Sequence, residues 1–120
     1  MTEDWRNPER VAPWKPRQQF NVTGDGRTAA EGYRAAVEAA QSSPDPRQEL
    51  ERAKREWAQR LALRPADGIL LEDLAGGLNS LAELQPTLQA CGLTLREARG
   101  TLDRLVAARL IEPLDAALMP

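Results

Sequence analysis

The stretch SLAELQPTLQACGLTLREARGTLDRLVAARLIEP, residues 80–113, is predicted to form two helices joined by one tight turn. Thr94 and Glu97 are spaced as in a capping box, which predicts that the second helix begins at this threonine. The apolar residues that follow recur at helical spacing and indicate one buried face. They are Leu95, Ala98, Leu102, Leu105 and Val106, and Arg96, Arg99, Gly100 and Asp103 lie opposite them. The stretch therefore predicts an amphipathic helix over 94–109 as the centre of the fold.

The first of the two helices is predicted from a second capping pair, Ser80 and Glu83. Its inward face is expected to carry Leu81, Leu84, Leu88 and Cys91. Pro86 lies inside this pattern, so we expect it to kink the helix or to delay its start. Gly92 followed by an apolar residue is typical of a helix that ends in a left-handed glycine.

Composition favours a single, mainly helical domain. The chain has 120 residues, of which 42% are hydrophobic but only 4% aromatic, and these proportions favour helix over sheet. The expected fold class is therefore all-α or mainly α. The formal net charge of −2 gives no global attraction to nucleic acid or to a membrane. With one cysteine, no signal-peptide pattern and no apolar run of membrane length, we expect a cytoplasmic protein with no membrane partner.

The N-terminal residues differ from the remainder because they are rich in proline and tryptophan and show no helical or alternating periodicity. We interpret residues 1–27 as a flexible, disordered arm. Its Pro-Trp-Lys-Pro unit at 13–16 fits a polyproline docking motif for a partner. The alternative is that Trp14 and Phe20 fold back onto the protein's own surface. This second interpretation is somewhat favoured, because Pro-x-x-Pro is frequent by chance.

Residues 28–64 are predicted to form two amphipathic helices. The first covers about 29–41 behind a cap at Thr28, and the second covers about 47–63 behind a cap at Asp45. The second helix presents an apolar stripe that includes Leu50, Trp57 and Leu61. This stripe either pairs with its twin in a homodimer or lies on the core of its own chain, and both interpretations stay open.

The end of the last helix carries a family resemblance. Residues 103–111, DRLVAARLI, are similar to the D-R-L-V-x-x-G-L-I close of bacterial winged-helix regulators, and residues 69–114 resemble a winged helix-turn-helix domain. Residues 77–84 also resemble variants of this domain that bind peptides, such as leader-peptide recognition domains. The resemblance implies three helices, the third a recognition helix, followed by a β-wing. Because Arg109 replaces the family's glycine and few residues follow Ile111, we expect the wing to be reduced or absent.

The net charge of the region helps to decide whether such a domain binds DNA or another protein. The winged-helix-like region, residues 65–120, contains four arginines and eight acidic residues, a net charge of −4. DNA binding depends on neutralising phosphates, so this acidity opposes it. Arg96 and Arg99 nevertheless lie on the face that a recognition helix turns toward guanine edges. Recognition of another protein is therefore the leading hypothesis, and sequence-specific DNA binding through the helix 94–109 is the alternative.

Catalysis has no support in the residue types present. The chain contains no histidine, which excludes Ser-His and Cys-His pairs and nearly all zinc sites. Cys91 is interpreted as a small buried apolar residue, and the adjacent Glu72 and Asp73 diverge on a helix. The sequence thus predicts a non-enzymatic regulator or adaptor without cofactor or metal. Its predicted partner-binding residues are Trp14, Phe20, Arg96, Arg99 and Asp103.

Overall fold

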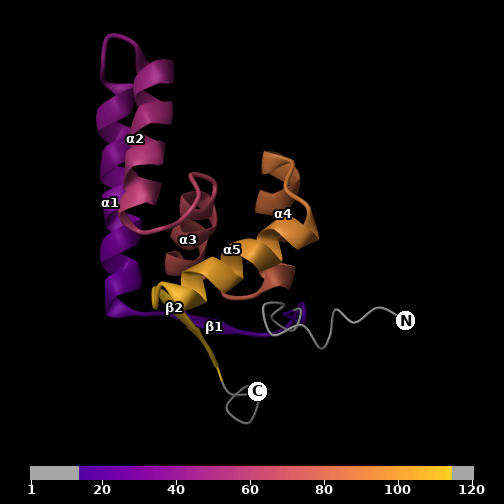
Figure 1. The fold of residues 1–120 in the computed structure, drawn as a ribbon. Coiled ribbons are helices and arrows are strands. Elements are labelled where there is room, and N and C mark those ends of the chain that lie inside the picture. The colour runs from indigo at the N-terminus through magenta and orange to yellow at the C-terminus, as the bar shows by residue number, and fades with distance from the viewer. Residues whose placement is uncertain (1–13, 115–120) are drawn as a thin grey trace.

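The computed structural model describes residues 14–114, which form a mainly helical fold with one small sheet (Figure 1). In chain order the elements are β1 Phe20–Val22, α1 Gly24–Gln41, α2 Pro46–Arg60, α3 Asp67–Ala75, α4 Leu81–Cys91, α5 Leu95–Ala107 and β2 Ile111–Pro113. The α1–α2 hairpin projects from the rest of the molecule, and α3, α4 and α5 gather beside its base (Figure 1). The predicted mainly α class is confirmed.

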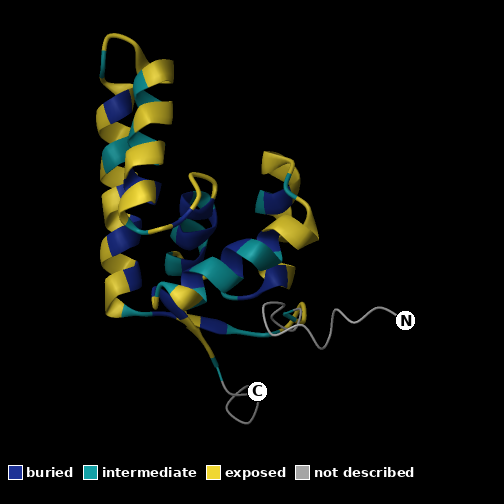
Figure 2. Ribbon diagram, viewed as in Figure 1, coloured by how far each residue is buried: buried dark blue, intermediate teal, exposed yellow. Residues whose placement is uncertain are grey.

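One cluster of buried side chains connects all of these elements. Figure 2 shows it in dark blue on α3, α4 and α5 and at the base of the hairpin, whereas most of the hairpin's outer part is exposed. The largest fully buried aliphatic side chains are Leu70, Leu71, Leu81, Leu84, Leu88, Leu102, Leu105 and Ile111. The predicted inward faces of α4 and α5 are thus confirmed over most of their length. They are wrong at Leu95, which is 44% exposed, and at Cys91, which is exposed, because both lie at helix ends beyond the core.

The predicted helix caps are confirmed at α2, α4 and α5. Asp45 accepts a hydrogen bond from the first turn of α2, and Ser80 does the same for α4. At α5 the capping box is complete, with Thr94 and Glu97 each bonding the other's backbone amide. α4 ends at Gly92 with a left-handed φ of 69°, also as predicted. The predicted delay at Pro86 is wrong, since α4 already begins at Leu81.

At the end of α5, an arginine occupies the left-handed backbone position that is usually taken by glycine. Arg109 has a φ of 62°, and its amide donates a hydrogen bond to the carbonyl of Val106. The next amide, from Leu110, donates to the carbonyl of Leu105. This pair of bonds is the Schellman arrangement, in which glycine usually occupies the left-handed position. Arg109 therefore adopts the left-handed conformation that glycine usually takes at such a helix end.

The sheet joins the two ends of the described chain. β1 and β2 are antiparallel, with Phe20 opposite Pro113 and Val22 opposite Ile111. In a two-stranded wing, the strand after the recognition helix pairs with the strand that follows it. Here β2 pairs instead with β1, which comes from in front of α1. The position after α5 is thus closed by an N-terminal strand.

The interpretation of residues 1–27 as a flexible arm is wrong from residue 14 onward, because residues 14–19 bond to other elements and residues 20–27 form β1 and the start of α1. Thr23 caps α1 through a 3.0 Å hydrogen bond from the amide of Gly26, so this helix begins at Gly24 and not behind Thr28. Gly26 lies so close to the chain after α5 that a Cβ atom there would be 1.9 Å from the Leu110 carbonyl oxygen. Glycine is therefore required where α1 crosses this segment. Residues 1–13 lie outside the described part of the chain.

The apolar stripe of α2 packs inside its own chain. Trp57 is only 2% exposed, and its indole Nε1 donates a 3.0 Å hydrogen bond to the carbonyl of Ala29. Its ring meets Tyr33 of α1 edge to face, with centroids 5.0 Å apart. The prediction of a dimer face is therefore wrong at Trp57, because α1 already covers this side chain. Leu50 and Leu61, the other two residues of that face, are half-buried.

Candidate functional site

Three of the five predicted partner-binding residues meet on the outer face of α5. The indole Nε1 of Trp14 donates a 2.8 Å hydrogen bond to Asp103 Oδ1. The Nε of Arg99 donates a 3.2 Å hydrogen bond to the carbonyl oxygen of Trp14. All three residues are half-buried. The structure thus brings these residues together, but in a contact within the chain.

Residues 14–19, here named the strap, are held at several points. The amide of Ala82 in α4 donates to the carbonyl of Pro16 (3.0 Å), and the amide of Leu114 donates to the carbonyl of Gln19 (2.9 Å). The Trp14 ring packs edge to face on Phe20, with centroids 5.1 Å apart. The predicted fold-back of Trp14 and Phe20 onto the protein's own surface is confirmed for these two residues.

The remaining two predicted residues differ from each other. Phe20 is 2% exposed, so its predicted role in binding a partner is wrong in this structure. Arg96 is exposed, and it forms no ion pair with any residue in the range 14–114. Among the predicted residues, Arg96 is therefore the only one whose side chain is both exposed and not engaged within the described part of the chain.

An ion pair with a buried carboxylate holds another arginine of α5, Arg104, whose side chain is 29% exposed. Asp67, at the start of α3, is 0% exposed and accepts hydrogen bonds from Arg104 Nε (2.8 Å) and from the hydroxyl of Thr101 (2.7 Å). Burial would raise the pKa of Asp67, but hydrogen bonds from Arg104, from the Arg64 amide and from Thr101 outweigh it and hold this pKa below its ordinary value. The pair fixes α5 on α3.

Sequence reasoning missed this pair because nothing local marks it. Asp67 resembles any acidic residue at the start of a helix, and Arg104 lies 37 residues away. The carboxyl of Asp103, next in sequence to that arginine, behaves in the opposite way. Burial raises its pKa above the ordinary value, although the hydrogen bond from Trp14 works against this shift. Two adjacent charges of α5 are thus committed to contacts within the protein.

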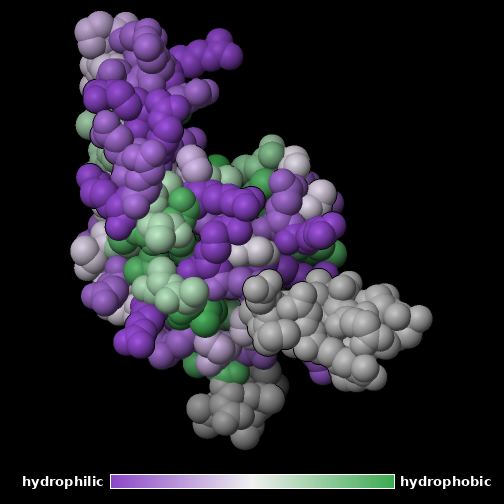
Figure 3. Space-filling model, viewed as in Figure 1, coloured by the Kyte–Doolittle hydropathy of each residue, from purple (hydrophilic) through white to green (hydrophobic). Residues whose placement is uncertain are grey.

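A hollow with an apolar floor lies where the hairpin joins α3, and sequence reasoning did not predict it. Its volume is about 330 Å³, and we name it the basic hollow. It is lined by Glu51, Lys54, Arg55, Pro65, Ala66 and Ile69. In Figure 3, hydrophobic surface gathers below the polar α1–α2 hairpin. The hollow combines charged residues of α2 with apolar residues of the α2–α3 connection and of α3.

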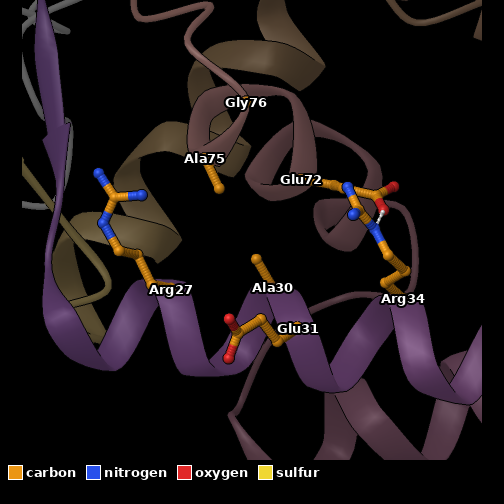
Figure 4. A pocket seen from close by; sticks show the side chains of 7 residues that line it. All are labelled: Arg27, Ala30, Glu31, Arg34, Glu72, Ala75 and Gly76. Carbon is orange, nitrogen blue, oxygen red and sulfur yellow. Dashed lines mark hydrogen bonds and ion pairs between the residues drawn. The ribbon is translucent and has the colours of Figure 1, made fainter.

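A second hollow, of about 180 Å³, lies between α1 and the end of α3 (Figure 4). Arg34 and Glu72 close one side of it with an ion pair of 2.9 Å. Arg27 and Glu31 project from α1 beside it, and Gly76 lies across from them (Figure 4). Its positive and negative groups balance each other, so this polar hollow shows no preference for a charged ligand.

The described residues contain no group of three or more cysteine, aspartate or glutamate side chains placed to hold a metal ion. Every buried side-chain nitrogen or oxygen in the same range has a hydrogen-bond partner. None of the described helices combines the length and the apolar character needed to cross a membrane. The chain matches no protein-family model, no functionally described protein and no solved structure. A proposal about function therefore has to be argued from the geometry and the charge of the protein surface.

Proposed function

We propose that this protein is a non-enzymatic binding protein of the cytoplasm, a small regulator or adaptor that acts by recognising another protein. The observation that carries the proposal is the covered face of α5. On this face Trp14 of the strap contacts both Arg99 and Asp103. A helix that reads DNA needs this face free to enter the major groove.

The charges of α5 support the same proposal. Arg104 is committed to the buried Asp67, and Arg99 bonds the strap, which leaves Arg96 as the exposed cation of the face. Residues 65–120 carry a net charge of −4, so they repel a phosphate backbone. Within the winged-helix resemblance, the protein stands closer to the variants that bind peptides than to those that bind DNA. Sequence-specific DNA binding through α5 is the alternative, favoured only by Arg96.

Binding to a random-sequence DNA duplex at low salt tests the proposal. We expect weak or no binding by the intact protein, and no change in the variant with both Arg96→Glu and Arg99→Glu. A pull-down from the native cell extract should recover a protein partner that nuclease treatment does not remove. Tight duplex binding that falls steeply with salt and disappears in this double variant would overturn the proposal, because phosphate contacts cause such salt dependence.

A further inference from the structure

The positive charge of this acidic protein is concentrated on one element. Residues 46–66, which span α2 and the connection to α3, carry a net charge of +3, whereas the whole chain carries −2. The cations are Arg47, Arg52, Lys54, Arg55, Arg60 and Arg64, and the carboxylates are Glu49, Glu51 and Glu56. An acidic partner is therefore attracted to this side of the molecule and repelled by most of the remainder.

The charges that line the basic hollow leave it with a net positive charge: Lys54 and Arg55 outnumber Glu51, and none of the three forms an ion pair with any residue between 14 and 114. The other two carboxylates of α2 both form ion pairs with Arg52. Two cations thus stand beside the apolar floor of the hollow without an ion-pair partner in the described chain.

The floor distinguishes a peptide from a nucleic acid. Pro65, Ala66 and Ile69 present apolar surface between the cations, and the volume of about 330 Å³ lies at the small end of the range for ligand pockets. A phosphate backbone would gain from Lys54 and Arg55 but would bury nothing apolar on the floor. A peptide can meet both features, since anchors of protein interfaces are apolar side chains surrounded by polar contacts.

We infer that the basic hollow binds an acidic peptide segment of a partner protein, which places one apolar side chain on Ile69 and its carboxylates beside Lys54 and Arg55. The inference rests on the proposed function and names its surface and the chemistry of its partner. It also separates the binding surface from the covered face of α5, so the strap does not have to move for the partner to bind.

Selection of random displayed peptides on the intact protein tests this inference. We expect the enriched peptides to be acidic and to contain an apolar residue, and we expect their affinity to fall with salt. The variant with both Lys54→Glu and Arg55→Glu should weaken the binding of a synthetic copy of such a peptide by about tenfold or more. The matched control, Arg47→Glu with Arg60→Glu, makes the same change of net charge on α2 outside the hollow and should weaken it much less.

The floor is tested with a second pair of variants. Ile69→Ser should weaken peptide binding, whereas Leu78→Ser, which removes an exposed leucine that does not line the hollow, should not. Enriched peptides that bind equally to the wild type and to the hollow variants would overturn the inference, yet leave protein recognition standing. Selection that enriches no acidic peptide, or a homodimer that Lys54→Glu with Arg55→Glu dissociates, would also overturn it. Salt-sensitive duplex binding lost in the Arg96 and Arg99 variant would instead remove the proposed function itself.

Discussion

The α3–α5 half of the molecule and the α1–α2 hairpin are stabilised in different ways. The three helices of the first half contribute seven leucines that are at most 1% exposed; these are Leu70, Leu71, Leu81, Leu84, Leu88, Leu102 and Leu105. The hairpin buries alanines around one tyrosine and one tryptophan, and most of its outer part is exposed (Figure 2). The first half is acidic, whereas α2 carries the positive charge.

The difference separates stability from recognition. The fully buried leucines concentrate the apolar burial, and with it the hydrophobic stabilisation, in the α3–α5 half. The hairpin contributes less burial but displays charge and the basic hollow on a projecting element. We therefore expect substitutions in the two regions to have different consequences, with unfolding dominating in the first and altered binding in the second.

The largest effect is expected at the ion pair between α3 and α5. Asp67→Asn removes the negative charge that compensates the partly buried Arg104, so it should lower the free energy of unfolding by about 3–5 kcal/mol. Urea denaturation followed by circular dichroism measures this loss. The control is Glu72→Gln on the same helix, whose partner Arg34 is exposed. Because exposed ion pairs contribute little, that variant should lose less than about 1 kcal/mol.

The second prediction compares one leucine from each region. Leu105 is 0% exposed, so Leu105→Ala should lower the free energy of unfolding by about 2–5 kcal/mol through lost burial and a new cavity. Leu50→Ala in the half-buried stripe of α2 should cost about 1 kcal/mol, and Arg96→Ala on the exposed face of α5 should stay within about 0.5 kcal/mol. Equal losses for Leu105→Ala and Leu50→Ala would contradict the contrast between the regions.

Features that depend on residues close together in the sequence were predictable, whereas contacts between distant residues were not. The caps at Asp45, Ser80 and Thr94 and the helix end at Gly92 were predictable, because each depends on residues within one turn. The leucine stripes were predictable from their period. A stripe shows that a face is apolar but not what covers it, so Trp57 was compatible with a dimer and with the α1 packing that the structure shows.

The candidate site depended on contacts that no local pattern indicates. The pairing of β1 with β2 and the bond from Trp14 to Asp103 each join residues about 90 positions apart, and neither has a short sequence signal. Irregular composition made residues 20–27 resemble a tail, although Phe20 and Val22 alternate with a polar residue as a short strand does. The lining of the basic hollow lies closer in sequence, between residues 51 and 69, but the hollow depends on how α3 turns back against α2, which no local pattern indicates.

The third prediction concerns pH and isolates the α3–α5 ion pair. Because the pKa of Asp67 is lowered in the folded protein, this carboxylate stabilises the fold at pH values above its ordinary, unfolded pKa. That stabilisation should be lost as the pH falls through the ordinary aspartate range, about 4, toward the lower folded value. Urea midpoints measured from neutral pH downward should fall more steeply for the wild type than for Asp67→Asn. Parallel curves would show that Asp67 is not ionised in a stabilising contact.

The smallest change in the free energy of unfolding is expected at the ends of α2 and α5, which both close with a left-handed residue that is not glycine. Arg109 closes α5 with a φ of 62°, and Ala62 follows α2 with a φ of 58°. A left-handed conformation costs a residue with a side chain about 1–2 kcal/mol, and the greater freedom of glycine in the unfolded chain offsets about 0.5–1 kcal/mol of any gain. Arg109→Gly and Ala62→Gly should therefore each raise the free energy of unfolding by up to about 1 kcal/mol.

The control for this last prediction is Ala107→Gly, two residues before Arg109 and at the end of α5, where the backbone is helical. Glycine has no conformational advantage there and should lower the free energy of unfolding by about 0.5–1 kcal/mol. Thermal or urea denaturation of the three variants should then show a higher free energy of unfolding for Arg109→Gly and Ala62→Gly and a lower one for Ala107→Gly. If Arg109→Gly destabilised the protein as much as Ala107→Gly, residue 109 would not be left-handed, and α5 would have to end in another way. A gain at Arg109 without one at Ala62 would instead show that the α5 end is formed more completely than the end of the hairpin, which would sharpen the contrast between the two regions.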